Sequence, residues 1–126
     1  MSSSKILVDL PVTFSHGQVK DFAAVSGDTN PIHLIKGYLP KLEGPIVHGA
    51  LLLSFVAGLI AGKMQGCMIL ETSAKFRRYV SVDEEVYITI TFEKEVPSLL
   101  LTTLSFVVRN KDDARMVSGE FLIRKL

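Results

Sequence analysis

Hydrophobic and polar residues alternate along much of the second half of the chain, which is the pattern of half-buried β-strands. The clearest run covers residues 86–92, where every second residue, beginning with Val86, is apolar and the residues between are Tyr or Thr. Four strands are predicted here, at residues 68–80, 85–95, 99–109 and 115–125. Because short turn-forming clusters separate consecutive strands, we expect an antiparallel sheet.

The first half of the chain predicts helices after an opening strand. Residues 5–14 are strand-like, although Pro11 should limit regular pairing there. Ser15 and Gln18 have the spacing of a capping box, so a helix should begin after Ser15, and Gly27 is placed to end it. Helices in the first half and a sheet in the second make the fold class α+β.

The most apolar segment of the chain is predicted to be its central helix, at about residues 46–62. Between residues 46 and 61 only His48 and Ser54 are clearly polar, and a helix that is apolar on every side must be buried all round. A membrane span is the alternative, but the segment is short for a bilayer, contains glycines and has a histidine near its start. We therefore expect one domain, residues 1–126, in which an antiparallel sheet wraps around this helix.

Composition and charge exclude several classes of function. The formal net charge of the 126 residues is +1 and no long run of Lys and Arg occurs, so the basic surface of a nucleic-acid binder is missing. The only basic cluster, Lys75-Phe76-Arg77-Arg78, is interpreted as a solvated strand end. A single cysteine, Cys67, allows no intramolecular disulfide, and residues 1–8 do not resemble a secretory signal. We expect a cytoplasmic protein with no membrane partner, the mitochondrial matrix and the peroxisome being alternatives.

Two polar motifs carry candidate chemistry, and the first is SGDTNPIH at residues 26–33. Asn30 before Pro31 predicts a helix start, because Asn can cap the first turn and Pro has no N–H to leave unpaired. His33 then falls in the first turn, where the helix dipole disfavours the protonated ring, so we expect a neutral imidazole. The structural alternative is that Asp28 and Asn30 only shape a turn and that the histidine has no chemical role.

The second motif is GPIVHG at residues 44–49, at the start of the predicted central helix. Gly49 would present a backbone N–H without a partner inside the helix, and an oxygen that becomes negative during a reaction could bind there. A carboxylate and a neutral imidazole, here Asp28 and His33, can hold a water between them and exchange protons with it. If the two motifs meet in space, they suit reversible addition of water to a double bond conjugated with a thioester, or thioester hydrolysis.

Other chemistries find less support in the sequence. The three histidines, His16, His33 and His48, are scattered, and no His–His or Cys–His spacing typical of a zinc site occurs. No glycine-rich phosphate-binding loop of the dinucleotide or Walker type is present. We therefore expect neither a metal nor a cofactor.

The two motifs, in this order, resemble the signature of the MaoC-like, (R)-specific enoyl-CoA hydratases. The resemblance covers nearly the whole chain in the order of its elements and implies a hot-dog fold, an antiparallel sheet wrapped around a long central helix. It implies that Asp28 and His33 are the catalytic pair and that Gly49 supplies an oxyanion-hole amide. It also implies that Asn30 orients the pair. The substrate-binding residues implied by the resemblance are Asn30, Pro45, Ile46, Val47 and His48.

The activity implied by the resemblance is that of a hydro-lyase, which adds water to a trans-2-enoyl thioester of coenzyme A or an acyl carrier protein and gives the (R)-3-hydroxyacyl product. Single hot-dog members of this family form homodimers, and apolar runs at residues 99–101 and 106–108 also predict that a second copy covers part of the sheet. The chain departs from the family pattern at Ile35, where an acidic residue is common, and at Ala50, where Met is common. These departures bear on acyl-chain length more than on the type of reaction.

Two other functions remain as alternatives. A hot-dog thioesterase typically carries a carboxylate on its central helix, whereas residues 46–62 contain no Asp or Glu. A non-catalytic acyl-thioester binding module would need the cavity but not the pair formed by Asp28 and His33.

Overall fold

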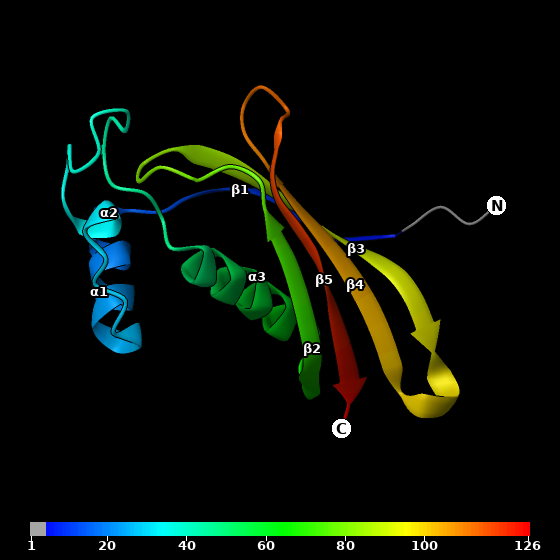
Figure 1. Cartoon of the computed structure of the whole chain (residues 1–126). Coiled ribbons are helices and arrows are strands. Elements are labelled where there is room, and N and C mark those ends of the chain that lie inside the picture. The colour runs from blue at the N-terminus through cyan, green and yellow to red at the C-terminus, as the bar shows by residue number, and fades with distance from the viewer. Residues whose placement is uncertain (1–4) are drawn as a thin grey trace.

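The computed structural model describes residues 5–126, which form a five-stranded antiparallel sheet curved around one long helix (Figure 1). The strands are β1 (Ile6–Thr13), β2 (Cys67–Phe76), β3 (Glu85–Val96), β4 (Leu101–Arg109) and β5 (Arg115–Lys125). Their order across the sheet is β1-β3-β4-β5-β2. The helices are α1 (His16–Ser26), the single turn α2 (Pro31–Leu34), the long helix α3 (Gly49–Lys63) and a 3-10 turn, η1 (Pro97–Leu99). The predicted α+β hot-dog fold is confirmed.

The core lies between α3 and the face of the sheet that curves around it. In β3 the alternate residues Val86, Ile88 and Ile90 are fully buried, as the alternation at residues 86–92 predicts. The register pairs β3 with β4 so that the inward side chains of both strands stand opposite one another. The buried residues contributed by α3 recur every four positions, at Leu52, Val56 and Ile60.

Local signals in the sequence account for α1. The hydroxyl of Ser15 accepts a hydrogen bond from the Gln18 N–H at 3.1 Å, and the Gln18 side chain accepts one from the Ser15 N–H at 2.8 Å. These two bonds are the predicted capping box. Gly27 has φ of 80°, a left-handed conformation that glycine adopts without steric cost, and it ends the helix as expected.

The central helix begins at Gly49, three residues later than predicted, and it is not buried all round. Residues 45–47 are extended instead, because they pair with residues 80–82: Ile46 forms an antiparallel bridge with Ser81, and the Val47 N–H donates to the Val80 carbonyl at 2.7 Å. Within this chain only one stripe of α3 is buried, and its opposite face is open. Among residues 5–126 the structure contains no helix long and apolar enough to cross a bilayer.

Three strand predictions also need correction. The strand predicted at 99–109 begins at Leu101, because η1 and the left-handed Leu100 (φ 59°) make a turn before it. Leu99 and Leu100 are therefore exposed in a turn, and that apolar run does not mark a second buried sheet face. Pairing also continues through Pro11, which stands opposite Tyr87. Proline is tolerated there because β1 is an edge strand. Finally, β2 ends at Phe76 rather than at residue 80.

Candidate active site

Asp28 lies in the loop between α1 and α2, and its carboxylate is half-exposed. The loop is shaped by its own polar groups. The Asp28 N–H donates to the Ser26 hydroxyl at 3.1 Å, and the Asn30 N–H donates to Oδ1 of Asp28 at 3.3 Å. One carboxylate oxygen, Oδ2, makes no hydrogen bond within the described chain and lies 3.7 Å from Nε2 of His33.

His33 is buried, and its ring has a defined orientation. Nδ1 lies 2.9 Å from the Ile46 carbonyl oxygen. Because a carbonyl oxygen can only accept, Nδ1 carries the hydrogen, and in the neutral ring Nε2 has the free lone pair that faces Asp28. α2 is a single turn, so its dipole is a weaker reason for a neutral ring than the sequence suggested. The hydrogen bond to Ile46 supplies the orientation instead.

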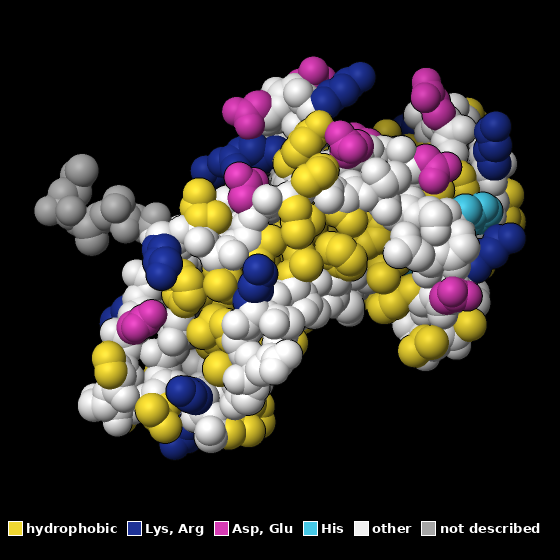
Figure 2. Space-filling view, turned by 180° about the vertical axis from the view of Figure 1, so that it is seen from behind, with side chains coloured by type: hydrophobic (Ala, Val, Ile, Leu, Met, Phe, Trp, Pro, Cys, Tyr) yellow, Lys and Arg dark blue, Asp and Glu magenta, His cyan; other side chains and the backbone are white. Residues whose placement is uncertain are grey.

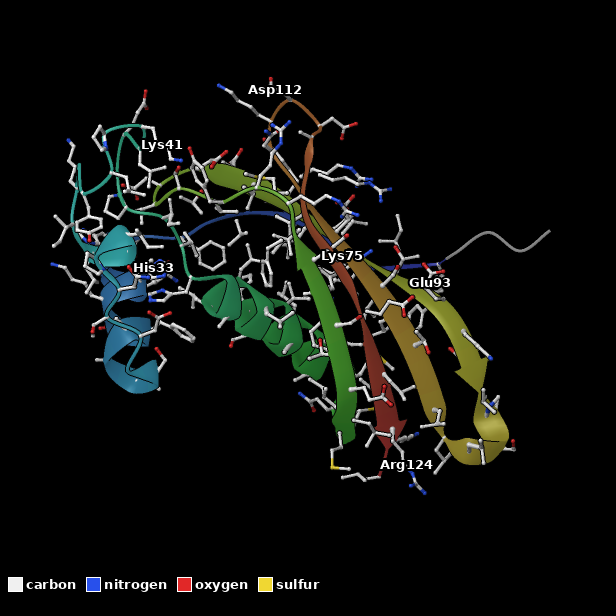
Figure 3. All side chains as sticks on the ribbon, in the orientation of Figure 1. His33, Lys41, Lys75, Glu93, Asp112 and Arg124 are labelled. Atoms are coloured by element: carbon white, nitrogen blue, oxygen red, sulfur yellow. The ribbon has the colours of Figure 1, made fainter. Side chains whose placement is uncertain are left out.

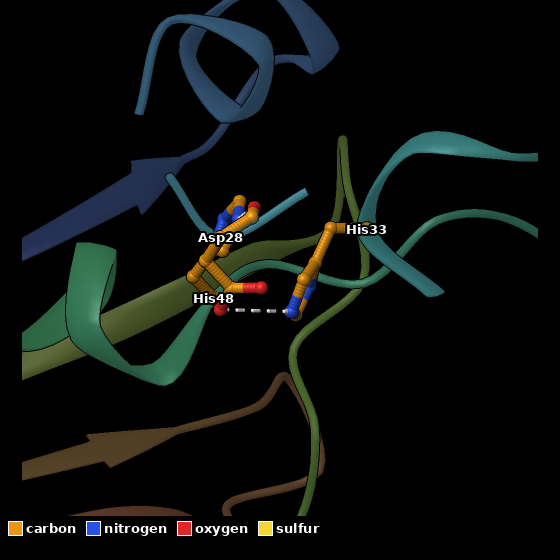
Figure 4. Close-up of side chains that lie close together, drawn as sticks. All are labelled: Asp28, His33 and His48. Atoms are coloured by element: carbon orange, nitrogen blue, oxygen red, sulfur yellow. Dashed lines mark hydrogen bonds and ion pairs between the residues drawn. The ribbon is translucent and has the colours of Figure 1, made fainter. Parts of the chain in front are cut away.

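The second motif meets the first through His48, which precedes α3. Nε2 of His48 lies 3.0 Å from the backbone carbonyl oxygen of Asp28. The ring of His48 stacks on that of His33, with centroids 3.8 Å apart and 23° between the planes. Figure 4 shows Asp28, His33 and His48 converging on one place, and Figure 3 shows that Arg124 lies far away along the sheet.

Gly49 is the first residue of α3, and no side chain caps this helix start. First-turn N–H groups have no partner within a helix, so this end can bind a developing negative charge. The ring of Phe76 packs directly on Gly49: a Cβ at this position would lie 2.7 Å from Cε1 of Phe76. A larger residue at this position would therefore force the Phe76 ring to move.

A cavity of about 350 Å³ adjoins these groups. Its lining includes five residues of the predicted site: His33 and the consecutive residues Ile46, Val47, His48 and Gly49 of the second motif. Three predicted site residues lie outside the lining, namely Asp28, Asn30 and Pro45. Asn30 caps α2, where its side-chain oxygen accepts from the Ile32 N–H at 3.3 Å.

One wall of the cavity was missed by the sequence prediction. It is formed by residues 76–80, together with Leu52 and Val117. The basic cluster that begins at Lys75 was interpreted as a solvated strand end, yet Phe76 within it covers Gly49. No local signal distinguishes this phenylalanine, because its contact is made with a residue far away in the chain.

Possible metal ligation can be judged from the donor atoms. Asp28, His33 and His48 each offer one ligand atom within 4.8 Å of the others, closer than the scattered sequence positions indicated. Nδ1 of His33 and Nε2 of His48 both bond to backbone carbonyl oxygens, which leaves Nε2 of His33 and Nδ1 of His48 beside the Asp28 carboxylate. The two rings stack face to face. The expectation that the site holds no metal stays a prediction.

The chain was compared with known families and proteins. Residues 3–110 match the model of the MaoC-like domain. An (R)-specific enoyl-CoA hydratase from Aeromonas caviae is 34% identical over 88% of this chain and 86% of its own length. Another, from Rhodospirillum rubrum, is 29% identical over 75% of this chain and 68% of its own length.

Solved structures agree with these matches. The (R)-hydratase of A. caviae superposes with a TM-score of 0.89 at 28% identity, covering 100% of this chain and 98% of its own. An unliganded R-hydratase from Pseudomonas aeruginosa has the same fold, with a TM-score of 0.87 at 23% identity over 99% of this chain and 82% of its own. On the family match and these relatives, the chain belongs to the MaoC-like domain family.

Proposed function

We propose that the protein is an (R)-specific enoyl-CoA hydratase, a hydro-lyase that adds water reversibly to trans-2-enoyl-CoA and gives (R)-3-hydroxyacyl-CoA. Two relatives that cover most of the chain have this name. The structural observation that carries the proposal is the convergence of Oδ2 of Asp28 and Nε2 of His33, 3.7 Å apart, beside the first turn of α3.

The proposed reaction uses one water and two proton-handling groups. The water is held by Asp28 and His33, and its oxygen forms a bond to C3 of the substrate while one of the two groups takes its proton. The electron pair of the double bond moves toward the thioester carbonyl, and an enolate develops. The proton taken from the water then passes to C2, from the group that took it or by way of the other member of the pair, which restores the carbonyl. Either member of the pair can act as the base in this scheme.

The thioester carbonyl is proposed to bind at Gly49. Its N–H would donate to the oxygen that becomes negative in the transition state, and the positive end of α3 adds to the same effect. The acyl chain would occupy the adjoining cavity, whose apolar lining includes Val47, Leu52 and Val117. Asn30 would act by holding α2, and with it His33, in place. Coenzyme A is the proposed carrier of the acyl group, an acyl carrier protein being the alternative, and no cofactor or metal takes part.

We further propose that the protein is a homodimer. α3 presents an open face with Ala50, Ser54 and Gly58, all exposed in the single chain. The edge strand β2 exposes Met68, Ile69 and Leu70 in succession. Figure 2 shows hydrophobic side chains gathered across the middle of one face. A second copy that covers α3 and pairs with the free edge of β2 would remove this apolar surface from water.

The cytoplasm is the proposed location. Cys67 is a free thiol in the structure and the chain offers no second cysteine for a disulfide, which suits a reducing compartment. The mitochondrial matrix and the peroxisome are the alternatives, and localisation of a tagged full-length chain would decide between the three.

The test is a panel of trans-2-enoyl-CoA and enoyl-carrier-protein thioesters of graded length, with chiral analysis of the product. Formation of the (R)-3-hydroxyacyl thioester from enoyl-CoA supports the proposal. Release of free coenzyme A without hydration would identify a thioesterase instead, the alternative that the lack of Asp and Glu in α3 disfavours. Binding without any turnover would identify an acyl-thioester binding module.

A further inference from the structure

His48 lines the cavity of the site but is almost completely buried. The residue is 1% exposed. Its ring lies between that of His33, at 3.8 Å, and that of Phe22 from α1, at 5.0 Å. Nε2 is bonded to the Asp28 carbonyl oxygen, and Nδ1 is buried without a partner among the described residues. A substrate contact, as expected from the sequence, would need a polar atom of this ring turned to the cavity.

The bond from His48 is the long-range support of the loop that carries Asp28. The other hydrogen bonds of that loop join residues two to four positions apart, such as Thr29 to Gly27 and Asn30 to Asp28. Among residues 5–126, the Nε2–H of His48 is the one donor from another part of the chain that bonds to residues 27–30. Without it, the position of the carboxylate would depend on local turn geometry alone.

The same ring limits the orientation of His33. The His33 imidazole is held at one edge by the bond from Nδ1 to the Ile46 carbonyl oxygen. A ring held only at an edge can still rotate about that bond. The stacked ring of His48 closes one of its faces and so sets the plane in which Nε2 points toward Asp28.

His48 is also the residue directly before Gly49, the proposed oxyanion donor, and its carbonyl accepts the first backbone bond of α3, from the Leu52 N–H at 3.1 Å. It therefore contacts Asp28 by a hydrogen bond, His33 by stacking and Gly49 by a peptide bond. We infer that His48 is a positioning residue, which fixes the acid–base pair relative to the first amide of α3. The contacts of His48 stand on the structure alone, whereas their effect on catalysis rests on the proposed hydratase function.

The bond to the Asp28 carbonyl defines which nitrogen of His48 carries hydrogen. Donation to a carbonyl oxygen requires hydrogen on Nε2, which leaves Nδ1 as an unprotonated lone pair in the neutral ring. The tautomer of His48 is therefore the opposite of that of His33, whose hydrogen is on Nδ1.

The first test separates the hydrogen bond from the stacking. His48→Gln keeps an N–H donor near the position of Nε2 and loses the ring, whereas His48→Phe keeps a stacked ring and loses the donor. We expect His48→Phe to lower kcat by about 10- to 100-fold with little change in KM, because the pair is misplaced rather than the substrate unbound. His48→Gln should recover a large part of that kcat. His16→Gln serves as the control and should leave both constants unchanged.

A double-mutant comparison shows whether His48 acts through Asp28. In an Asp28→Asn background, His48→Phe should cost much less than in the wild type, because the group that it positions no longer works. If His48→Phe lowers kcat by the same factor in the Asp28→Asn background as in the wild type, the inference is overturned, since such a result would indicate a general structural effect. A raised KM at unchanged kcat would also overturn it, in favour of a substrate contact.

The second test needs neither activity nor a variant. Long-range ¹H–¹⁵N spectra of the wild-type imidazoles report which nitrogen of each ring carries hydrogen. We expect hydrogen on Nδ1 of His33 and on Nε2 of His48. A His48 that is protonated on Nδ1 at neutral pH would overturn the inference, even if hydratase activity is present. Absence of hydratase activity with the expected tautomers would instead reject the proposed function and leave the positioning geometry intact.

Discussion

Nε2 of His33 and Oδ2 of Asp28 lie 3.7 Å apart, beyond the range of a direct N–H···O hydrogen bond. Both atoms are acceptors when the imidazole is neutral and the carboxyl group ionised. A single water can therefore donate one hydrogen to each of them. This spacing supports the proposal that the pair holds a water rather than bonding to itself.

Replacing either member of this pair should abolish most of the hydratase activity. We expect Asp28→Asn and His33→Ala each to lower kcat by about 10²-fold or more, the usual contribution of a general acid or base. Steady-state kinetics with a short trans-2-enoyl-CoA checks this. Asp21→Asn, on the exposed side of α1, is the matched control and should keep wild-type rates. Full activity in both site variants would reject the assigned pair.

Gly49→Ala should be damaging although the change is a single methyl group. The new Cβ would lie 2.7 Å from the Phe76 ring and beside the amide that is proposed to bind the thioester oxygen. We expect kcat/KM to fall by about 10²-fold, the scale of losing one oxyanion donor. In the double variant with Phe76→Leu, the melting temperature should recover while the activity should not. Recovery of both would show that only the steric clash mattered.

A second glycine provides the control for this experiment. Gly17 also lies in the first turn of a helix, and a Cβ there would meet only the Ser15 hydroxyl, at 3.7 Å. Gly17→Ala should therefore raise the free energy of unfolding by about 0.5–1 kcal/mol, the helix-propensity difference between the two residues. Thermal and urea denaturation measure this, and kcat should not change. A loss of stability would contradict the open space seen around Gly17.

Loss of the α1 cap should reduce stability without altering the chemistry. Ser15→Ala removes the acceptor for the Gln18 N–H and should lower the free energy of unfolding by about 1 kcal/mol. Urea denaturation gives the value, and Ser98→Ala, in the exposed turn η1, is the control. Activity measured well below the melting temperature should stay at the wild-type level.

The proposed dimer can be tested on the edge strand β2. Leu70→Lys places a charge on an edge residue that is 41% exposed in the single chain and should shift the protein toward a monomer. Leu99→Lys, in the turn η1, makes the same change at a residue outside the proposed interface. Light scattering should give the mass of two 13.9 kDa chains for the wild type and the Leu99 variant. A wild-type mass of one chain would reject the dimer outright.

The parts of the fold that were predicted correctly depend on signals between near neighbours. Ser15 and Gln18 are three residues apart, and Asn30 and Pro31 are adjacent, so each helix start is encoded where it occurs. The alternation at residues 86–92 likewise identifies the buried face of β3 without knowledge of its partners. Such local patterns are enough to order the elements.

The parts that were predicted wrongly depend on partners distant in the chain. The start of α3 was placed too early because apolar composition at residues 46–48 does not reveal their pairing with residues 80–82. The contact of Phe76 with Gly49 joins two apolar positions, and no pattern in either segment indicates it. The motif around His48 likewise gives no sign of its two contacts with the first motif, the bond to the Asp28 carbonyl and the stacking on His33.

The backbone of Ile46 links the orientation of the His33 ring to the pairing of residues 45–47 with residues 80–82. Its carbonyl holds Nδ1 of His33, while its strand bridge to Ser81 and the neighbouring bond from the Val82 N–H to the Pro45 carbonyl tie it to residues 80–82. Each local opening of this pairing would release the imidazole, which the proposed reaction needs in place. The amide exchange rate of Val82 would report how often the pairing opens, and we expect a variant that loosens it to lose turnover before it unfolds.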